Sequence, residues 1–126
     1  MRAFLPLMLC VVTVASCASK PVRIAADRCW SVSLGDKVEG TAVLSAYKAR
    51  FGCTECGASV AARDCPGMGF AIGSGSADQA YHRILRTAPA NGNGYVQQVV
   101  FLSGKVVPNG APGRLMIRAE QLRLAH

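Results

Sequence analysis

The sequence lacks an apolar run long enough for a permanent membrane span. No charged residue stands between Arg2 and Lys20, but the apolar run over residues 4–14 is shorter than the roughly 20 residues that cross a bilayer as a helix. One positive charge followed by a short apolar run is typical of a cleaved secretory signal peptide. We therefore assign residues 1–16 to a signal peptide and expect the remaining chain to be exported.

Acidic residues and histidines are few, which leaves little material for acid–base catalysis. The seven acidic residues are spread over different segments, and the two histidines are His82, in a predicted helix, and the terminal His126. No pair of these residues has a spacing that implies a general acid and a general base. The sequence thus predicts no catalytic residue, and we expect a non-enzymatic protein without a cofactor.

The chain also lacks a second CxxC motif, which argues against a zinc ribbon because such sites usually have two. Besides Cys17, four cysteines follow the signal peptide: Cys29, Cys53, Cys56 and Cys65. An even number of cysteines in an oxidising compartment indicates two disulfides, and three pairings are open. We therefore expect structural disulfides and no bound metal.

The single CxxC motif, Cys53-Thr-Glu-Cys56, also has a redox interpretation. In thioredoxin-like proteins this spacing places one cysteine at a helix amino terminus, where the thiolate is stabilised. Here Gly52 and Gly57 flank the motif and no helical pattern follows it. Thiol–disulfide exchange by Cys53 and Cys56 is therefore the alternative to a structural role.

The signal peptide ends in Val14-Ala15-Ser16-Cys17, which resembles the lipobox of bacterial lipoproteins. The resemblance implies cleavage before Cys17, a diacylglycerol on its sulfur and acylation of the new amine, for example by palmitate. Several acyl chains anchor a protein stably, where one chain binds reversibly. Ala18 follows in place of an aspartate, a pattern that resembles sorting to the periplasmic side of the outer membrane. An ordinary cleavage site at the same residues would give a soluble product in the same compartment.

The mature chain is basic. Thirteen of the fourteen Lys and Arg residues and all seven acidic residues follow residue 16, so the side chains carry a net charge of +6. Lys20, Arg23 and Arg28 follow the lipidated cysteine, so residues 17–34 suit a tether along an anionic headgroup surface. In the cell envelope, the partners of a basic surface are anionic lipid headgroups, anionic glycans or acidic proteins, and not nucleic acid.

The rest of the chain, residues 35–126, has the pattern of one small, mainly β domain with one short helix. Alternating apolar residues from Val38 predict a long strand, Ser76 starts a helix as its cap, and Asn109-Gly110 with Pro112-Gly113 predicts a hairpin turn. The other expected strands cover residues 58–63, 67–72, 95–107 and 114–124. This order resembles the OB-fold, a five-stranded, partly open barrel, and another small disulfide-stapled β sandwich or roll is the alternative.

The resemblance to an OB-fold implies a ligand face near the loops after the first strand and before the last strand. Lys48, Arg50 and Lys105 are our candidates for contact with an anionic ligand there. Basic residues at strand ends also serve as solvated, edge-protecting residues, and that is the competing interpretation. The sequence therefore favours a lipid-anchored, non-catalytic module that binds an anionic envelope component or a protein partner.

Overall fold

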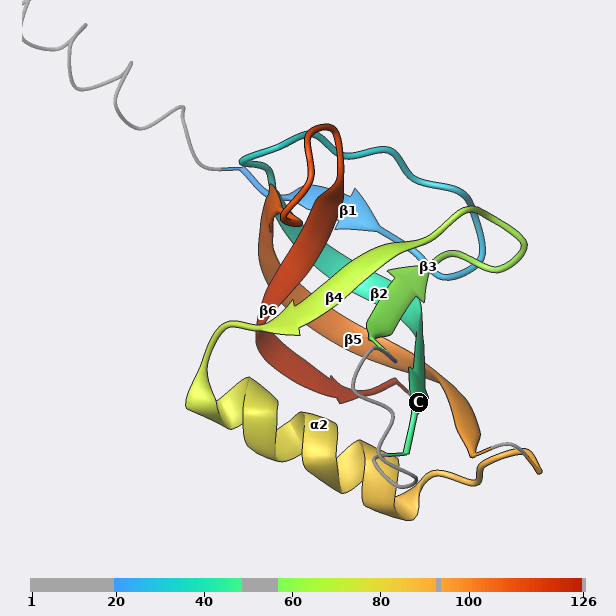
Figure 1. Cartoon of the computed structure of the whole chain (residues 1–126). Helices are drawn as coiled ribbons and strands as arrows, with labels where there is room; N and C mark the ends of the chain where they lie inside the picture. The colour runs from blue at the N-terminus through green and yellow to red at the C-terminus, as the bar shows by residue number, and fades with distance from the viewer. Residues whose placement is uncertain (1–19, 49–56, 93, 126) are drawn as a thin grey trace, which may run out of the picture.

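The computed structural model describes residues 20–48, 57–92 and 94–125. Within them the chain is mainly β, with one helix after the fourth strand (Figure 1). The elements in chain order are β1 Val22–Ile24, β2 Lys37–Tyr47, β3 Ala58–Ala61, β4 Met68–Ile72, α2 Gly75–Thr87, β5 Tyr95–Pro108 and β6 Leu115–Leu124. From β2 onward this is the order of strands and helix that the sequence predicts.

Five of the strands close into a barrel. β2 pairs antiparallel with both β3 and β5, β3 pairs antiparallel with β4, and β6 lies antiparallel to β5 and parallel to β4. The ring β2–β3–β4–β6–β5 therefore returns to β2. The predicted OB-like barrel is confirmed, and the sandwich or roll is excluded.

Alternation along β2 separates the barrel core from the outer face. Val38, Ala42, Leu44 and Ala46 are buried, while the residues between them are half-buried. The same period of two runs along β6, where Ile117 and Ala119 are fully buried and the residues beside them point outward. Small outward side chains on β2 leave room for a groove on the outside of the barrel.

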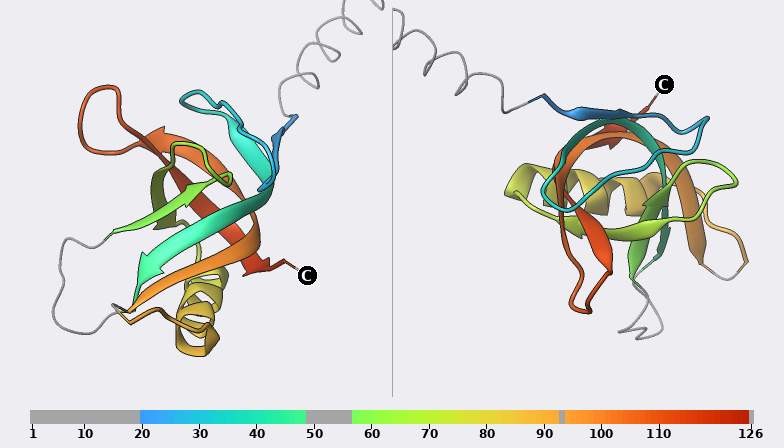
Figure 2. Two further views of the ribbon diagram at one scale, coloured as in Figure 1. Left: turned by 90° about the vertical axis from the view of Figure 1, so that its right-hand side faces the viewer. Right: turned by 90° about the horizontal axis from the view of Figure 1, so that it is seen from above.

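β1 is an additional strand that lies parallel to β2 on the outside of the barrel (Figure 2). Ile24 is 5% exposed, and the Ala26 N–H donates a hydrogen bond to the Thr41 hydroxyl at 3.0 Å. The sequence predicts a tether over residues 17–34, but residues 22–24 belong to the folded domain. Three residues are too few to show an alternating pattern, so the sequence gives no signal for this strand.

The helix α2 closes one end of the barrel, opposite the end where the described chain begins (Figure 1). Its N-cap is Ser74, whose hydroxyl accepts a hydrogen bond from the Ala77 N–H at 3.4 Å and donates one to the Glu120 carbonyl at 2.7 Å. The prediction of Ser76 as the cap is wrong, because the contact with β6 selects the earlier serine. No helix in the described part of the chain is long and apolar enough to cross a membrane.

One disulfide joins Cys29 to Cys65, with 5.7 Å between the two Cα atoms. It ties the segment after β1 to the turn between β3 and β4, and it confirms a structural disulfide in this domain. The lipidation candidate Cys17 and the motif cysteines Cys53 and Cys56 lie outside the described residues.

Candidate functional site

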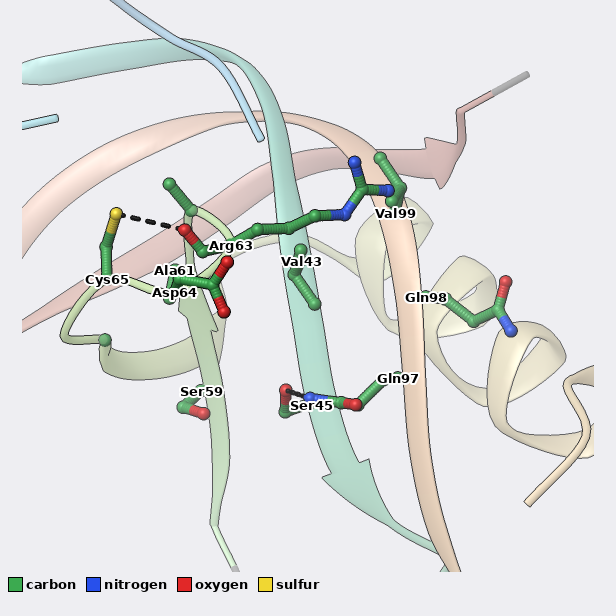
Figure 3. A pocket seen from close by; sticks show the side chains of 12 residues that line it. Val43, Ser45, Ser59, Ala61, Arg63, Asp64, Cys65, Gln97, Gln98 and Val99 are labelled. Atoms are coloured by element: carbon green, nitrogen blue, oxygen red, sulfur yellow. Dashed lines mark hydrogen bonds between the residues drawn. The ribbon is translucent and has the colours of Figure 1, made fainter. Parts of the chain in front are cut away.

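A groove of about 520 Å³ crosses the outer face of the barrel over β2, between the end of β3 and the first half of β5 (Figure 3). Its floor is apolar and made of small side chains. In the strand register Val43 stands between Ala61 on β3 and Val99 on β5. All three are half-buried, so the floor is partly protected from water while remaining accessible to a ligand.

The next row along β2 is polar. Ser45 stands between Ser59 on β3 and Gln97 on β5, and the Gln97 amide donates a hydrogen bond to the Ser45 hydroxyl at 3.3 Å. The row presents two hydroxyls and one amide beside the apolar floor. These groups both donate and accept hydrogen bonds, as recognition of hydroxyl-bearing ligands requires.

Arg63 places a positive charge over the groove. Figure 3 shows its side chain extending from the end of β3 across β2 toward Val99. Within residues 20–48, 57–92 and 94–125, no acidic side chain forms an ion pair with it. The guanidinium therefore retains its five N–H donors for a bound anion.

The turn that carries Arg63 is fixed at several points. The Arg63 N–H donates to the Ala26 carbonyl at 2.9 Å, and the Cys65 N–H donates to the Ala62 carbonyl at 3.2 Å. Asp64 adopts a positive φ of 60° in this turn and lines the same groove. The disulfide through Cys65 adds a covalent restraint, so the arginine stands on a rigid support.

Aromatic side chains border the groove along the same outward stripe. Tyr47 and Tyr95 follow the polar row, with 4.9 Å between their ring centroids, and Tyr47 is 42% exposed. Beyond the apolar row, the Arg123 guanidinium lies over the Phe101 ring, 4.4 Å from the centroid. The Tyr47 and Tyr95 rings therefore offer flat apolar surface next to the polar row, whereas Arg123 covers one face of Phe101.

The structure does not bring the predicted ligand contacts together. Lys48 directly follows β2 and borders a hollow with Arg86 of α2, whereas Lys105 stands opposite Lys37 at the other end of β2. An 11-residue strand is on the order of 35 Å long, so Lys48 and Lys105 cannot contact one small ligand. Arg50 lies outside the described residues.

Sequence reasoning missed Arg63 and Gln97, which line the same groove. The turn signal Asp64-Cys65-Pro66-Gly67 beside a cysteine is the only hint that Arg63 is held in place. Nothing in the sequence pairs it with a residue more than thirty positions later. Strand register creates that proximity.

The groove has the chemistry of a binding site. It combines the Arg63 guanidinium and the Asp64 carboxylate with hydroxyl and amide groups, an apolar floor and bordering aromatic rings. Within the described part of the chain, no three His, Cys, Asp or Glu side chains stand close enough to hold a metal. No protein-family model, curated protein or solved structure matches this chain.

Proposed function

We propose that this protein is an exported, lipid-tethered binding module whose groove over β2 takes an anionic glycan of the cell envelope. The observation that carries the proposal is the Arg63 side chain lying across a groove lined by Ser45, Ser59 and Gln97. An arginine fork binds a carboxylate through two parallel hydrogen bonds. The hydroxyls and the amide match the hydroxyls of a sugar, and the aromatic pair suits its apolar face.

The lipobox sequence Val14-Ala15-Ser16-Cys17 supports export of the protein and its attachment to a membrane through a lipid. A lipid on Cys17 holds the barrel at a membrane, where a glycan polymer is present at high local concentration. Because the lipid holds the protein next to the glycan, the effective concentration of glycan at the groove is high, and a groove of modest affinity is sufficient. The proposal includes no catalytic step, because the groove contains no general acid and base pair positioned around a reacting atom.

The test is calorimetric titration of the purified protein with soluble peptidoglycan fragments, which carry carboxylates on a sugar backbone. We expect Arg63→Gln to weaken binding about tenfold or more, because a charge-assisted bidentate contact is lost. Arg83→Gln, on an exposed position of α2, is the matched control and should leave the affinity unchanged. Equal affinities of wild type and Arg63→Gln would rule out the groove as the glycan site, and tighter binding to an acidic protein would replace the glycan with a protein partner.

A second function is thiol–disulfide exchange by the Cys53 and Cys56 pair. The Cys29–Cys65 disulfide favours it, because this pairing leaves the two CxxC cysteines as the remaining candidates for each other. Alkylation of the native protein before and after reduction separates the two roles. Uptake of label at Cys53 and Cys56 without reductant, together with insulin reductase activity that Cys53→Ser abolishes, would establish exchange in place of a structural bridge.

A further inference from the structure

Three positive charges stand side by side across three strands, in a row that begins at the end of β2 away from α2. Lys37 on β2 is directly opposite Lys105 on β5, and Lys105 is directly opposite Arg118 on β6. All three residues are exposed. Like charges opposite each other repel and destabilise a sheet. The row therefore has a cost in the isolated protein that an anionic partner would relieve.

An exposed apolar side chain accompanies the row. Leu34 is 59% exposed, the most exposed large apolar side chain among the described residues, and it lies in the turn just before β2. This turn is attached to β5, because the Gly35 N–H donates to the Val106 carbonyl and the Val106 N–H donates to the Asp36 carbonyl, both at 2.9 Å. The position of Leu34 is thus set by the barrel.

The described chain begins at the same end. Pro21 lines a hollow of about 340 Å³ together with Lys37 and Lys105, four positions after Cys17. Figures 1 and 2 show the start of the described chain, the turn before β2 and the β5–β6 connection at the end of the barrel away from α2. Whatever holds Cys17 therefore lies near the row.

Two acidic residues lie beside the row, and among the described residues neither forms an ion pair with Lys37, Lys105 or Arg118. Glu39 lines the same hollow, but its carboxylate forms an ion pair with Arg23 at 2.7 Å. Glu120 also lines the hollow and is exposed. Lys20, at the start of the described chain, is a further exposed cation at this end.

We propose that this end of the barrel docks on an anionic phospholipid surface. Leu34 enters the boundary between headgroups and acyl chains, while Lys37, Lys105 and Arg118 contact lipid phosphates. An apolar residue surrounded by cations suits that boundary, where each basic residue adds to the attraction of anionic lipids. The proposal rests on the lipid anchor at Cys17, and it adds a fixed orientation that leaves the groove over β2 and the helix α2 accessible from the aqueous side.

The four lysines of the chain allow a direct test, because Lys48 lies at the opposite end from Lys20, Lys37 and Lys105. The processed, lipidated protein is placed in nanodiscs of phosphatidylcholine, or of an equal mixture with phosphatidylglycerol, and acetylated with an amine-reactive reagent. Mass spectrometry then gives the acetylation rate of each lysine. We expect Lys37 and Lys105 to react at least about fivefold more slowly on the anionic discs, and Lys48 to react at the same rate on both.

Matched variants separate docking from tethering. Arg118→Gln and Leu34→Ser should each reduce the protection of Lys37 by about fivefold, since each removes a membrane contact. Arg86→Gln removes the same charge from α2 and should leave the protection unchanged. Equal reactivity of Lys37 on the two kinds of disc, or equal protection of all four lysines, would overturn the proposal.

Different results would refute the lipid anchor and the docking surface. An amino-terminal peptide without a lipid mass would refute the anchor alone. The unlipidated protein is then centrifuged with the same two kinds of vesicle. If the docking surface is real, it sediments with the anionic vesicles and stays in solution with phosphatidylcholine, and no sedimentation with either would refute the surface.

Discussion

Gly40 is the residue that lets β1 lie against β2. A Cβ atom at this position would overlap the backbone carbonyl of Ile24, and the backbone has a φ of +148° that favours glycine. The obstructing group is main chain, so no side-chain rotation relieves the overlap. Gly40→Ala should therefore separate β1 from the barrel.

The expected cost has two parts. Backbone strain at positive φ contributes about 1–2 kcal/mol. Release of β1 exposes Ile24, which is 5% exposed in the folded protein, and loses about 2 kcal/mol of apolar burial. Gly40→Ala should thus lower the free energy of unfolding by about 3–4 kcal/mol.

Gly35→Ala is the matched control. Gly35 also has a positive φ, of +90°, but a Cβ atom there would have no neighbour within 4 Å. It should cost only the strain part, about 1–2 kcal/mol. Urea unfolding followed by the fluorescence of Trp30, the single tryptophan, measures both variants. Equal losses in the two variants would refute the argument that close strand approach requires the glycine.

Three further predictions concern stability. The Cys29–Cys65 disulfide joins residues 36 apart, so replacing both cysteines with serine should lower the free energy of unfolding by about 4 kcal/mol, and an unchanged urea midpoint would contradict this. Ser74→Ala removes the N-cap of α2 and should cost about 1 kcal/mol in the same assay, whereas Ser76→Ala should cost clearly less. Burial raises the pKa of Tyr81 above its ordinary value of 10.0. The unfolded chain then ionises first, so stability should fall as pH rises above about 10, and Tyr81→Phe should weaken that fall when urea midpoints at about pH 8 and about pH 11 are compared.

Local patterns were sufficient to predict the strands and the helix, and the resemblance of their order to the OB-fold predicted the barrel. The apolar residues Val38, Ala42, Leu44 and Ala46 stand at alternating positions of a long strand. This pattern predicts β2 correctly because one face of the strand is buried in the barrel. The β5–β6 hairpin follows from its glycine and proline turn residues. These elements depend on residues close in sequence, which is why the sequence alone identifies them.

The groove and β1 could not be predicted in the same way. Arg63 and Gln97 line one groove only because β3 and β5 both pair with β2, and a pairing between distant strands leaves no mark in either segment. Lys48 and Lys105 stand near predicted loops, but the length of β2 separates them. Strand register decides which residues share the groove, whereas the prediction selected basic residues near the ends of strands.

The most direct test of the proposed binding module is a map of ligand contacts by NMR. The protein, labelled with ¹⁵N, is titrated with soluble peptidoglycan fragments while its backbone amide shifts are recorded. Binding in the groove predicts shift changes over Ser45, Ser59, Arg63 and Gln97, and their loss in Arg63→Gln. Shift changes confined to α2 or to the Lys37 and Lys105 end, or no changes at saturating ligand, would contradict the account.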